Sequence, residues 1–151
     1  MNALEESREQ IAKAEQRLKS LELQVAHYRS LRDQEETMAS KINDRILDIA
    51  ASLEGLEGQR HRIQERVLSC IESEDENGAL AGKEELAKLT SDSRRLVDQQ
   101  IAMKEMMEAA VREAGSLELQ QEKVDNAYWK LYEDLRALRY QYRRMGGNLG
   151  G

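Results

Sequence analysis

Apolar residues recur with a seven-residue period through the first half of the chain. Counted in sevens from Leu4, the first (a) and fourth (d) positions of ten consecutive heptads are mostly apolar. The a positions are Leu4, Ile11, Leu18, Val25, Arg32, Ala39, Ile46, Leu53, Arg60 and Val67, and the d positions are Ser7, Ala14, Leu21, Tyr28, Glu35, Ile42, Ile49, Leu56, Ile63 and Cys70. Such an unbroken a/d seam is typical of a left-handed coiled coil, and it predicts a helix over residues 3–73.

A break and a second seam follow. Residues 72–82 read ESEDENGALAG, and the acids followed by Asn77-Gly78 and Gly82 predict an acidic turn over residues 74–82. The second seam has a positions Leu86, Ser93, Gln100, Met107, Ala114, Gln121, Tyr128, Leu135 and Tyr142, and d positions Leu89, Leu96, Met103, Ala110, Leu117, Val124, Leu131, Leu138 and Met145. It predicts a second helix over residues 83–145, ended by Gly146-Gly147, and a frayed tail over residues 146–151.

The two seams complement each other when the chain folds back at Gly78. Paired residue numbers then sum to 156, and every a position meets a d position. The pairs include Cys70 with Leu86, Val67 with Leu89, Tyr28 with Tyr128, Ile11 with Met145, and the polar pair of Glu35 with Gln121. We therefore expect an all-α fold, a long antiparallel two-helix coiled-coil hairpin that forms a single domain over residues 1–151.

A long parallel dimer, hinged at the acidic segment, is the alternative architecture. It would place Arg32, Glu35 and Arg60 against their own copies, and like charges that face each other across a seam are unfavourable. This comparison favours the hairpin. The polar seam at Arg32, Glu35 and Gln121 has two interpretations, a layer that fixes the register or a flexible point.

Composition narrows the class of protein further. The chain has no proline and no phenylalanine, 34% charged residues and a net charge of -6. The negative charge disfavours nucleic-acid binding, and the apolar runs are too short to span a membrane. The polar N-terminal segment MNALEESREQ does not resemble a secretory signal, and the single cysteine, Cys70, fits a reducing compartment. A cytoplasmic protein is expected.

Residues that could carry chemistry are scattered. His27 and His61 fall at outer heptad positions far apart along the first helix, and Cys70 lies on the seam. The carboxylates lie mostly at outer positions, where i,i+4 pairs with lysine and arginine are their ordinary role. The sequence therefore predicts a protein that is not an enzyme and has no cofactor and no metal site.

The candidate binding residues cluster at the end of the second helix. Trp129, Tyr132 and Tyr140 fall at b, e and f positions, where we expect exposure, and exposed aromatic residues are enriched in binding hot spots. Four arginines without an acid share the stretch 135–145, so we expect this end to bind an acidic protein surface. The predicted partner-binding residues are Trp129, Tyr132, Arg136, Arg139, Tyr140, Arg143 and Arg144. A second, weaker apolar patch comprises Val97, Ile101, Met106, Val111, Met38 and Leu47.

Two segments resemble a known family. The string Ala14-Glu15-Gln16-Arg17-Leu18-Lys19-Ser20-Leu21, continued by His27-Tyr28-Arg29, is similar to the helix of FliJ-type flagellar export stalks. The stretch QEKVDNAYWKL at 121–131 resembles the last helix of YscO-type stalks of type III secretion. The resemblance implies a stalk whose terminal end enters a hexameric ATPase and whose other faces contact an export gate or chaperones. It also implies a monomer or weak dimer.

A structural coiled-coil module of a cytoskeletal or tethering complex is the alternative function. It requires only the hairpin and the apolar patch, and it involves no ATPase. A prefoldin-like chaperone is disfavoured, because ESEDENGALAG lacks the alternating β-branched residues of a β-hairpin.

Overall fold

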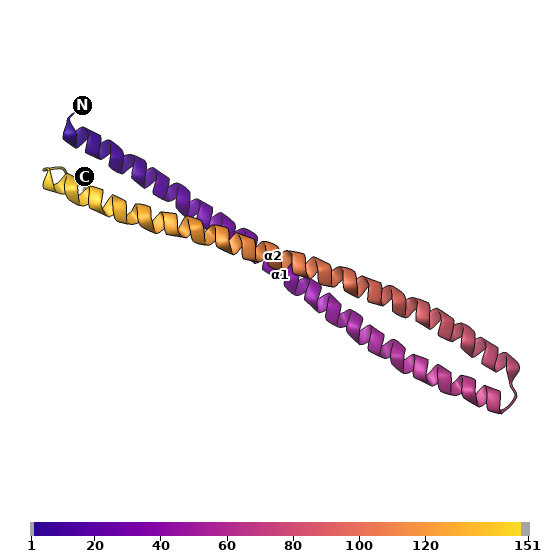
Figure 1. Ribbon diagram of the computed structural model, residues 1–151. Coiled ribbons are helices and arrows are strands. Elements are labelled where there is room, and N and C mark those ends of the chain that lie inside the picture. The colour runs from indigo at the N-terminus through magenta and orange to yellow at the C-terminus, as the bar shows by residue number, and fades with distance from the viewer. Residues whose placement is uncertain (1, 149–151) are drawn as a thin grey trace. The chain divides into compact units, whose positions relative to one another are not determined.

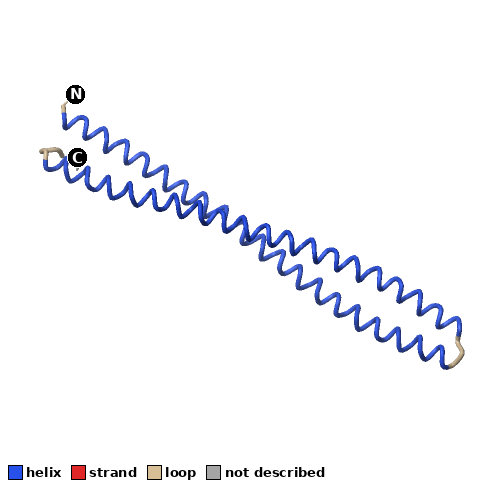
Figure 2. Tube along the Cα trace, in the orientation of Figure 1, coloured by secondary structure: helices blue, strands red, loops and turns tan. Residues whose placement is uncertain are grey.

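The computed structural model describes residues 2–148 of the chain. It contains two helices, α1 (Ala3–Glu72) and α2 (Glu76–Arg144), joined by a short connection (Figure 1). Figure 2 shows no strand in this part of the chain. The helices pack against each other as an all-α helical hairpin, which confirms the predicted fold class. Neither helix has, over the described residues, a stretch long and apolar enough to cross a membrane.

The chain divides into two compact units, each made of one stretch of α1 and one antiparallel stretch of α2. Within the described residues, unit 1 comprises 2–36 with 112–148, and unit 2 comprises 37–111 and includes the connection. The buried side chains of unit 1 are Ile11, Leu21, Ala114, Leu117, Leu135 and Tyr142. Those of unit 2 are Ile42, Ile46, Ile49, Val67, Ala79, Leu89 and Ala110.

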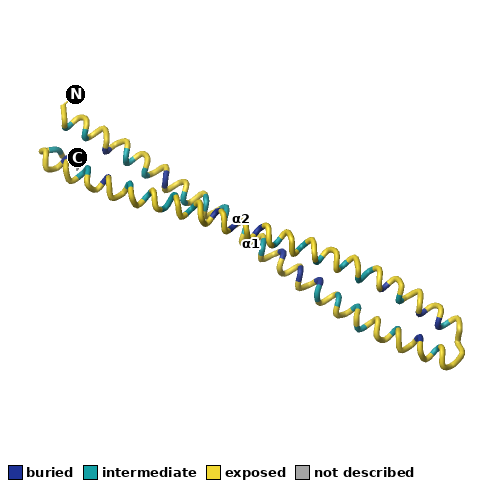
Figure 3. Tube along the Cα trace, viewed as in Figure 1, coloured by how far each residue is buried: buried dark blue, intermediate teal, exposed yellow. Residues whose placement is uncertain are grey.

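The predicted seams account for the burial pattern. Buried residues recur at heptad spacing along both helices (Figure 3), and nearly all predicted a and d residues are buried or half-buried. The exceptions are Arg60, which forms a salt bridge of 3.2 Å with Glu57 on its own helix, and Met145. Arginine at a seam position can extend its charged group toward solvent in this way.

The connection is shorter than predicted, because α1 ends in a tight hydrogen-bonded motif. Glu74 adopts a left-handed conformation with φ of 58°. The amide of Asp75 donates to the Cys70 carbonyl at 2.8 Å, and the amide of Glu74 donates to the Ile71 carbonyl at 3.2 Å. These are the two bonds of a Schellman motif, which satisfies the last carbonyl groups of the helix. Only residues 73–75 separate the helices, so the predicted turn over residues 74–82 is wrong.

The second helix begins at Glu76 rather than at residue 83, because Asp75 caps it. The Asp75 carboxylate accepts a hydrogen bond of 3.0 Å from the amide of Gly78, an N-cap arrangement. Gly78 and Gly82 therefore lie inside α2. A Cβ atom at Gly82 would overlap the side chain of Val67 on α1, so this glycine permits close approach of the helices instead of forming a turn.

The shorter connection changes the pairing of the helices by one heptad. Val67 contacts Gly82 rather than Leu89, which lies seven residues further along α2. The predicted pair of Ile11 with Met145 is also wrong. Ile11 packs in a cluster with Leu135 and Tyr142, and the partly buried Leu4, Ala14, Leu18 and Leu138 surround it.

The predicted polar pair of Glu35 with Gln121 does not form. The Gln121 amide oxygen is buried and has no hydrogen-bond partner in the described part of unit 1. Arg32 instead faces acids of its own helix, with guanidinium–carboxylate distances of 3.7 Å to Asp33 and 3.8 Å to Glu36. An unpaired buried amide destabilises the fold by roughly 1–3 kcal/mol, so this layer lowers stability.

The end of α2 repeats the motif that ends α1. Gly146 has φ of 89°, its amide donates to the Arg143 carbonyl at 3.1 Å, and the Gly147 amide donates to the Tyr142 carbonyl at 2.9 Å. A Cβ atom at Gly147 would overlap the Tyr142 ring, so the two glycines form an ordered cap. Helix α2 ends at Arg144, one residue before the predicted end at residue 145. The predicted tail over residues 146–151 begins with these two hydrogen-bonded glycines. Its last part, 149–151, lies outside the described residues.

Candidate functional site

Five of the seven predicted binding residues share one face of α2 in unit 1. Trp129, Tyr132, Arg136, Arg139 and Arg143 follow one another at intervals of three and four residues. This spacing places side chains in one row along a helix. We call this row the aromatic–basic stripe. Trp129 is 55% exposed and Tyr132 is 39% exposed, so both aromatic residues of the stripe reach the surface as predicted.

The aromatic rings of the stripe are held in a fixed arrangement. The Trp129 and Tyr132 rings meet edge to face, with centroids 5.6 Å apart and an interplanar angle of 73°. The ring of Tyr128 contacts both, edge-on to Trp129 at 5.2 Å and stacked on Tyr132 at 6.4 Å. Edge-to-face and offset pairs are the favourable geometries of aromatic rings. The Tyr128 contacts therefore restrict the motion of Trp129 although its outer face is exposed.

Tyr128 and Glu22 are members of the site that the sequence did not indicate. The Tyr128 hydroxyl donates a hydrogen bond of 3.1 Å to the Glu22 carboxylate on α1. Partial burial of the phenol raises the pKa of Tyr128 above its ordinary value, and the hydrogen bond to Glu22 raises it further. The sequence pairing placed Tyr128 against Tyr28. If the pairing is displaced by one heptad, Tyr128 lies opposite Leu21. Glu22 follows Leu21 at an e position beside the seam, within reach of the Tyr128 hydroxyl.

The four arginines of the predicted basic end have different partners. Arg139 forms an interhelical salt bridge of 3.0 Å with Glu15. Arg136 and Arg143 have no ion-pair partner among the described residues. The first turn of α1 in the same unit carries Glu5 and Glu6, next to Leu4 of the Ile11 cluster. The predicted basic end of unit 1 is therefore less basic than residues 135–145 alone predict. Arg136 and Arg143 of the stripe remain available to bind an external anion.

The remaining two predicted residues pair beside the stripe. Arg144 donates a hydrogen bond of 3.3 Å to the Tyr140 hydroxyl, and its guanidinium carbon lies 5.8 Å from the centroid of the Tyr140 ring. This is a cation–π pair between residues four apart on the helix. Their f and c positions place them on the outer face of α2, next to the stripe.

The second predicted patch is exposed but does not form one surface. Val97 and Ile101 lie four residues apart at e and b positions on one flank of α2 in unit 2. Met106 falls at a g position, on the opposite flank of the seam. Each flank therefore offers a single row of apolar side chains. Such rows suit two separate narrow contacts better than one broad interface.

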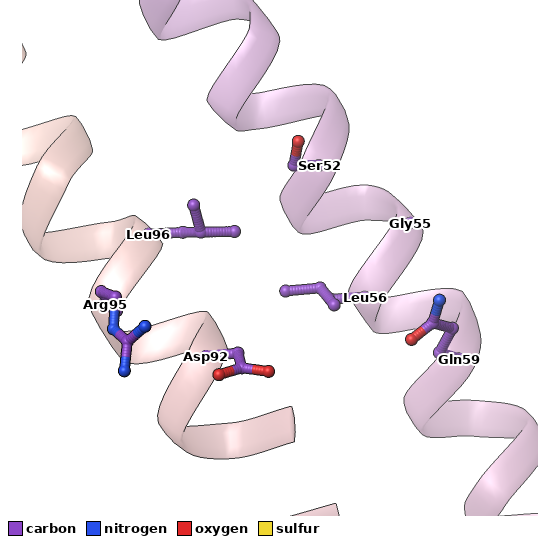
Figure 4. Close-up of a pocket in the computed structure, with 7 residues that line it drawn as sticks. All are labelled: Ser52, Gly55, Leu56, Gln59, Asp92, Arg95 and Leu96. Atoms are coloured by element: carbon purple, nitrogen blue, oxygen red, sulfur yellow. The ribbon is translucent and has the colours of Figure 1, made fainter. Parts of the chain in front are cut away.

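Two hollows open between the helices of unit 2. The larger has a volume of 410 Å³ and is shown in Figure 4, with Leu56 of α1 and Leu96 of α2 pointing toward each other. Its lining residues are Ser52, Gly55, Leu56, Gln59, Asp92, Arg95 and Leu96. The other has 270 Å³ and brings Arg60 together with Leu89 and Ser93. The predicted rule that paired residue numbers sum to 156 would instead place Arg60 against Leu96. No group of three or more His, Cys, Asp and Glu side chains within residues 2–148 is arranged to hold a metal ion.

A third surface lies beside the connection and was missed by sequence reasoning. A hollow of 680 Å³ is lined by Cys70, Ile71, Glu74, Asp75, Glu76, Ala79, Leu80 and Lys83. We call it the tip groove. The sequence indicated only the acidic residues there, because residues 74–82 were predicted as a turn. Continuation of the second seam back to Ala79 would have placed Leu80 on the outer face of a helix.

Comparisons with protein-family models, with curated proteins and with solved structures give no match for this chain.

Proposed function

We propose that this protein is a non-enzymatic coiled-coil stalk or adaptor that binds a partner protein through the aromatic–basic stripe. The observation that carries the proposal is Trp129, which is exposed and held by Tyr128 and Tyr132. Arg136 and Arg143 lie next to it and have no ion-pair partner among the described residues. Tryptophan, tyrosine and arginine are the residues most enriched in binding hot spots. Because the rings are already oriented, binding loses little side-chain entropy.

An acidic helix is the partner surface that suits the stripe. Its residues lie in a single row, which is how a helix presents a contact surface to another helix. Arg136 and Arg143 can each contact a carboxylate, while Trp129 and Tyr132 cover apolar side chains of the partner.

The resemblance to FliJ-type and YscO-type stalks supports a specific form of the proposal. In that form the cytoplasmic chain couples the export ATPase of a type III secretion or flagellar system to its export gate. Unit 1, which carries the stripe, is then the part that contacts the ATPase. The exposed Val97 and Ile101 of unit 2 favour a second candidate, a structural module of a cytoskeletal or tethering complex.

The test measures ATP hydrolysis by the hexameric export ATPase of the same organism, with and without this protein. We expect the wild-type chain to raise turnover and the variant Arg143→Glu/Arg144→Glu to lose that stimulation with unchanged helicity. The matched control is Arg94→Glu/Arg95→Glu, which reverses the same charges at the same b and c positions in unit 2. Trp129→Ala should also abolish stimulation.

Two results contradict the proposal. Absence of stimulation by the wild-type protein rejects the ATPase stalk and leaves the structural module. Equal stimulation by the wild type, the Arg143→Glu/Arg144→Glu variant and Trp129→Ala rejects the stripe as the contact surface.

A further inference from the structure

Three large apolar side chains are exposed beside the connection in unit 2. Leu68 is 60% exposed, Ile71 is 53% exposed and Leu80 is 59% exposed. Leu68 and Ile71 lie three residues apart on one face of α1, and Ile71 and Leu80 line the tip groove from the two helices. Exposed apolar groups gathered around a hollow and surrounded by polar residues mark a binding surface rather than an ordinary helix face.

Ile71 and Leu80 form the apolar floor of the groove, and carboxylates form its rim. Glu74, Asp75 and Glu76 line the groove, with Lys83 as its one basic residue. Asp75 already accepts the capping hydrogen bond from Gly78. Glu74 and Glu76 have no ion-pair partner among the described residues. The groove therefore combines an apolar floor with two free carboxylates.

The groove is formed before any partner arrives. The Schellman motif at Glu74 and the Asp75 cap fix the backbone of residues 73–75. A Cβ atom at Gly78 would overlap the Asp75 carboxylate and crowd the Cys70 sulfur, so the helices approach closely below the floor. A preformed site binds with a smaller entropic cost than a flexible loop.

We infer that the tip groove binds a basic amphipathic helix of a partner protein. Such a helix places leucine-like side chains against Ile71 and Leu80 and its lysines or arginines against Glu74 and Glu76. The Cys70 sulfur adds a polarisable surface that adapts to different apolar side chains. The acidic rim repels nucleic acid and anionic lipid, which leaves a basic protein segment as the complementary occupant. This inference is independent of the aromatic–basic stripe, which lies in unit 1.

The probe is a fluorescein-labelled peptide of leucine and lysine, roughly five helical turns long, with its leucines along one face. Its binding to the full-length protein is measured by fluorescence anisotropy. We expect saturable binding that weakens with salt, and no binding of the same peptide with glutamate in place of lysine. A photo-crosslinking version of the lysine peptide should attach within residues 68–83.

Matched variants separate the floor from the rim. Ile71→Ser/Leu80→Ser and Glu74→Gln/Glu76→Gln should each weaken binding about tenfold or more, because each removes one half of the complementarity. The controls remove equivalent exposed residues elsewhere: Leu23→Ser/Leu119→Ser in unit 1 and Glu105→Gln/Glu108→Gln in unit 2. Both controls should bind as the wild type does.

Three results overturn the inference. The first is equal affinity for the lysine and glutamate peptides, or no binding of either peptide. The second is equal weakening by the groove variants and their controls, or crosslinks outside residues 68–83. The third is concentration-dependent dimerisation in sedimentation runs that Ile71→Ser/Leu80→Ser abolishes, because the occupant is then a second copy of this chain.

Discussion

At the scale of single residues, Tyr128 connects the core of unit 1 to its surface. Its pKa lies above the ordinary value of about 10, first because the phenol is partly buried and then because it donates to Glu22. The folded state therefore favours the neutral phenol. We predict that the stability contributed by Tyr128 is complete below pH of about 10 and is lost as the pH rises through its raised pKa. Tyrosinate absorbance should therefore contain a late component from Tyr128 that ionises above the ordinary range of a tyrosine.

Two substitutions assign that late transition. Tyr128→Phe should remove it, and Glu22→Gln should move it toward lower pH, because the neighbouring carboxylate charge is gone. The phenol of Tyr128 stays partly buried in Glu22→Gln, so its pKa should fall only part of the way toward the ordinary value. If Tyr128→Phe instead removes a component that ionises at the ordinary pH of about 10, the contact is contradicted.

Glu74 is the second residue whose local geometry predicts a measurable effect. Its φ of 58° belongs to the left-handed region, where a residue with a Cβ atom is strained by about 1–2 kcal/mol. Glycine there relieves the strain but increases the entropy of the unfolded chain. We predict that Glu74→Gly raises the free energy of unfolding by about 0.5–1 kcal/mol, measured by urea unfolding followed by circular dichroism.

A glycine at an ordinary helical position supplies the control for Glu74→Gly. Gln64 is exposed within α1, so Gln64→Gly should lower stability by about 1 kcal/mol. Loss of stability in both variants would show that Glu74 is not strained.

At the scale of the helices, two glycines of unit 2 have opposite roles. A Cβ atom at Gly55 meets nothing within 4 Å, whereas one at Gly82 overlaps Val67. Gly55→Ala should therefore stabilise α1 by about 1 kcal/mol through helix propensity. Gly82→Ala gains the same propensity but overpacks a stiff β-branched side chain, at a cost of about 1–3 kcal/mol. In urea unfolding, the free energy of unfolding of Gly82→Ala should be lower than that of Gly55→Ala by about 1–3 kcal/mol.

A double-mutant cycle identifies the cause of this difference. Val67→Ala leaves room for a methyl group at position 82, so Gly82→Ala should cost less in that background than in the wild type. Equal costs in both backgrounds would exclude close packing of Gly82 on Val67.

The helices themselves could be predicted from the sequence, but the connection between them could not. A seven-residue apolar period over ten heptads specifies both the secondary structure and the buried face. The connection depends instead on Glu74, which adopts a conformation that glycine usually adopts. Because residues 73–75 contain no glycine, they carry no signal of a helix end. Asn77-Gly78 and Gly82 are frequent turn residues, yet here they lie inside α2, and the two glycines leave room for the side chains of Cys70 and Val67 on α1.

The site was predicted as far as helical spacing allows. The b and e positions of Trp129 and Tyr132 correctly indicated exposure, since exposure follows from the heptad position on one helix. Contacts across the helices, such as Tyr128 with Glu22 and Arg139 with Glu15, depend on how the two helices are paired. They could not be derived while that pairing was in error by seven residues.

At the scale of the whole molecule, a heptad repeat leaves the pairing of two helices ambiguous. Displacement of one helix by seven residues keeps every a position opposite a d position, so the seam pattern cannot distinguish the two arrangements. Only the connection decides between them. With residues 73–75 as the connection, Val67 faces Gly82; with a fold at Gly78, it would face Leu89.

An engineered disulfide distinguishes these arrangements and the parallel dimer. A Cβ atom at Gly82 would lie 3.7 Å from the Val67 Cβ, close to the mean of about 3.8 Å in disulfides. We predict that Val67→Cys/Gly82→Cys, made in a Cys70→Ser background, oxidises within one chain at any protein concentration. A closed loop of about 15 residues should raise the free energy of unfolding by about 3 kcal/mol.

The pair Val67→Cys/Leu89→Cys is the matched control. Leu89 lies two helical turns, about 10 Å along the axis, beyond the level of Val67, which is too far for an unstrained disulfide. Non-reducing mass spectrometry should therefore find free thiols in the control and a mass lower by two hydrogen atoms in the first pair. Oxidation of the control alone would restore the fold at Gly78. A disulfide that joins two chains would indicate a dimer, because a parallel arrangement brings each residue next to its own copy and leaves residues 67 and 82 of one chain far apart.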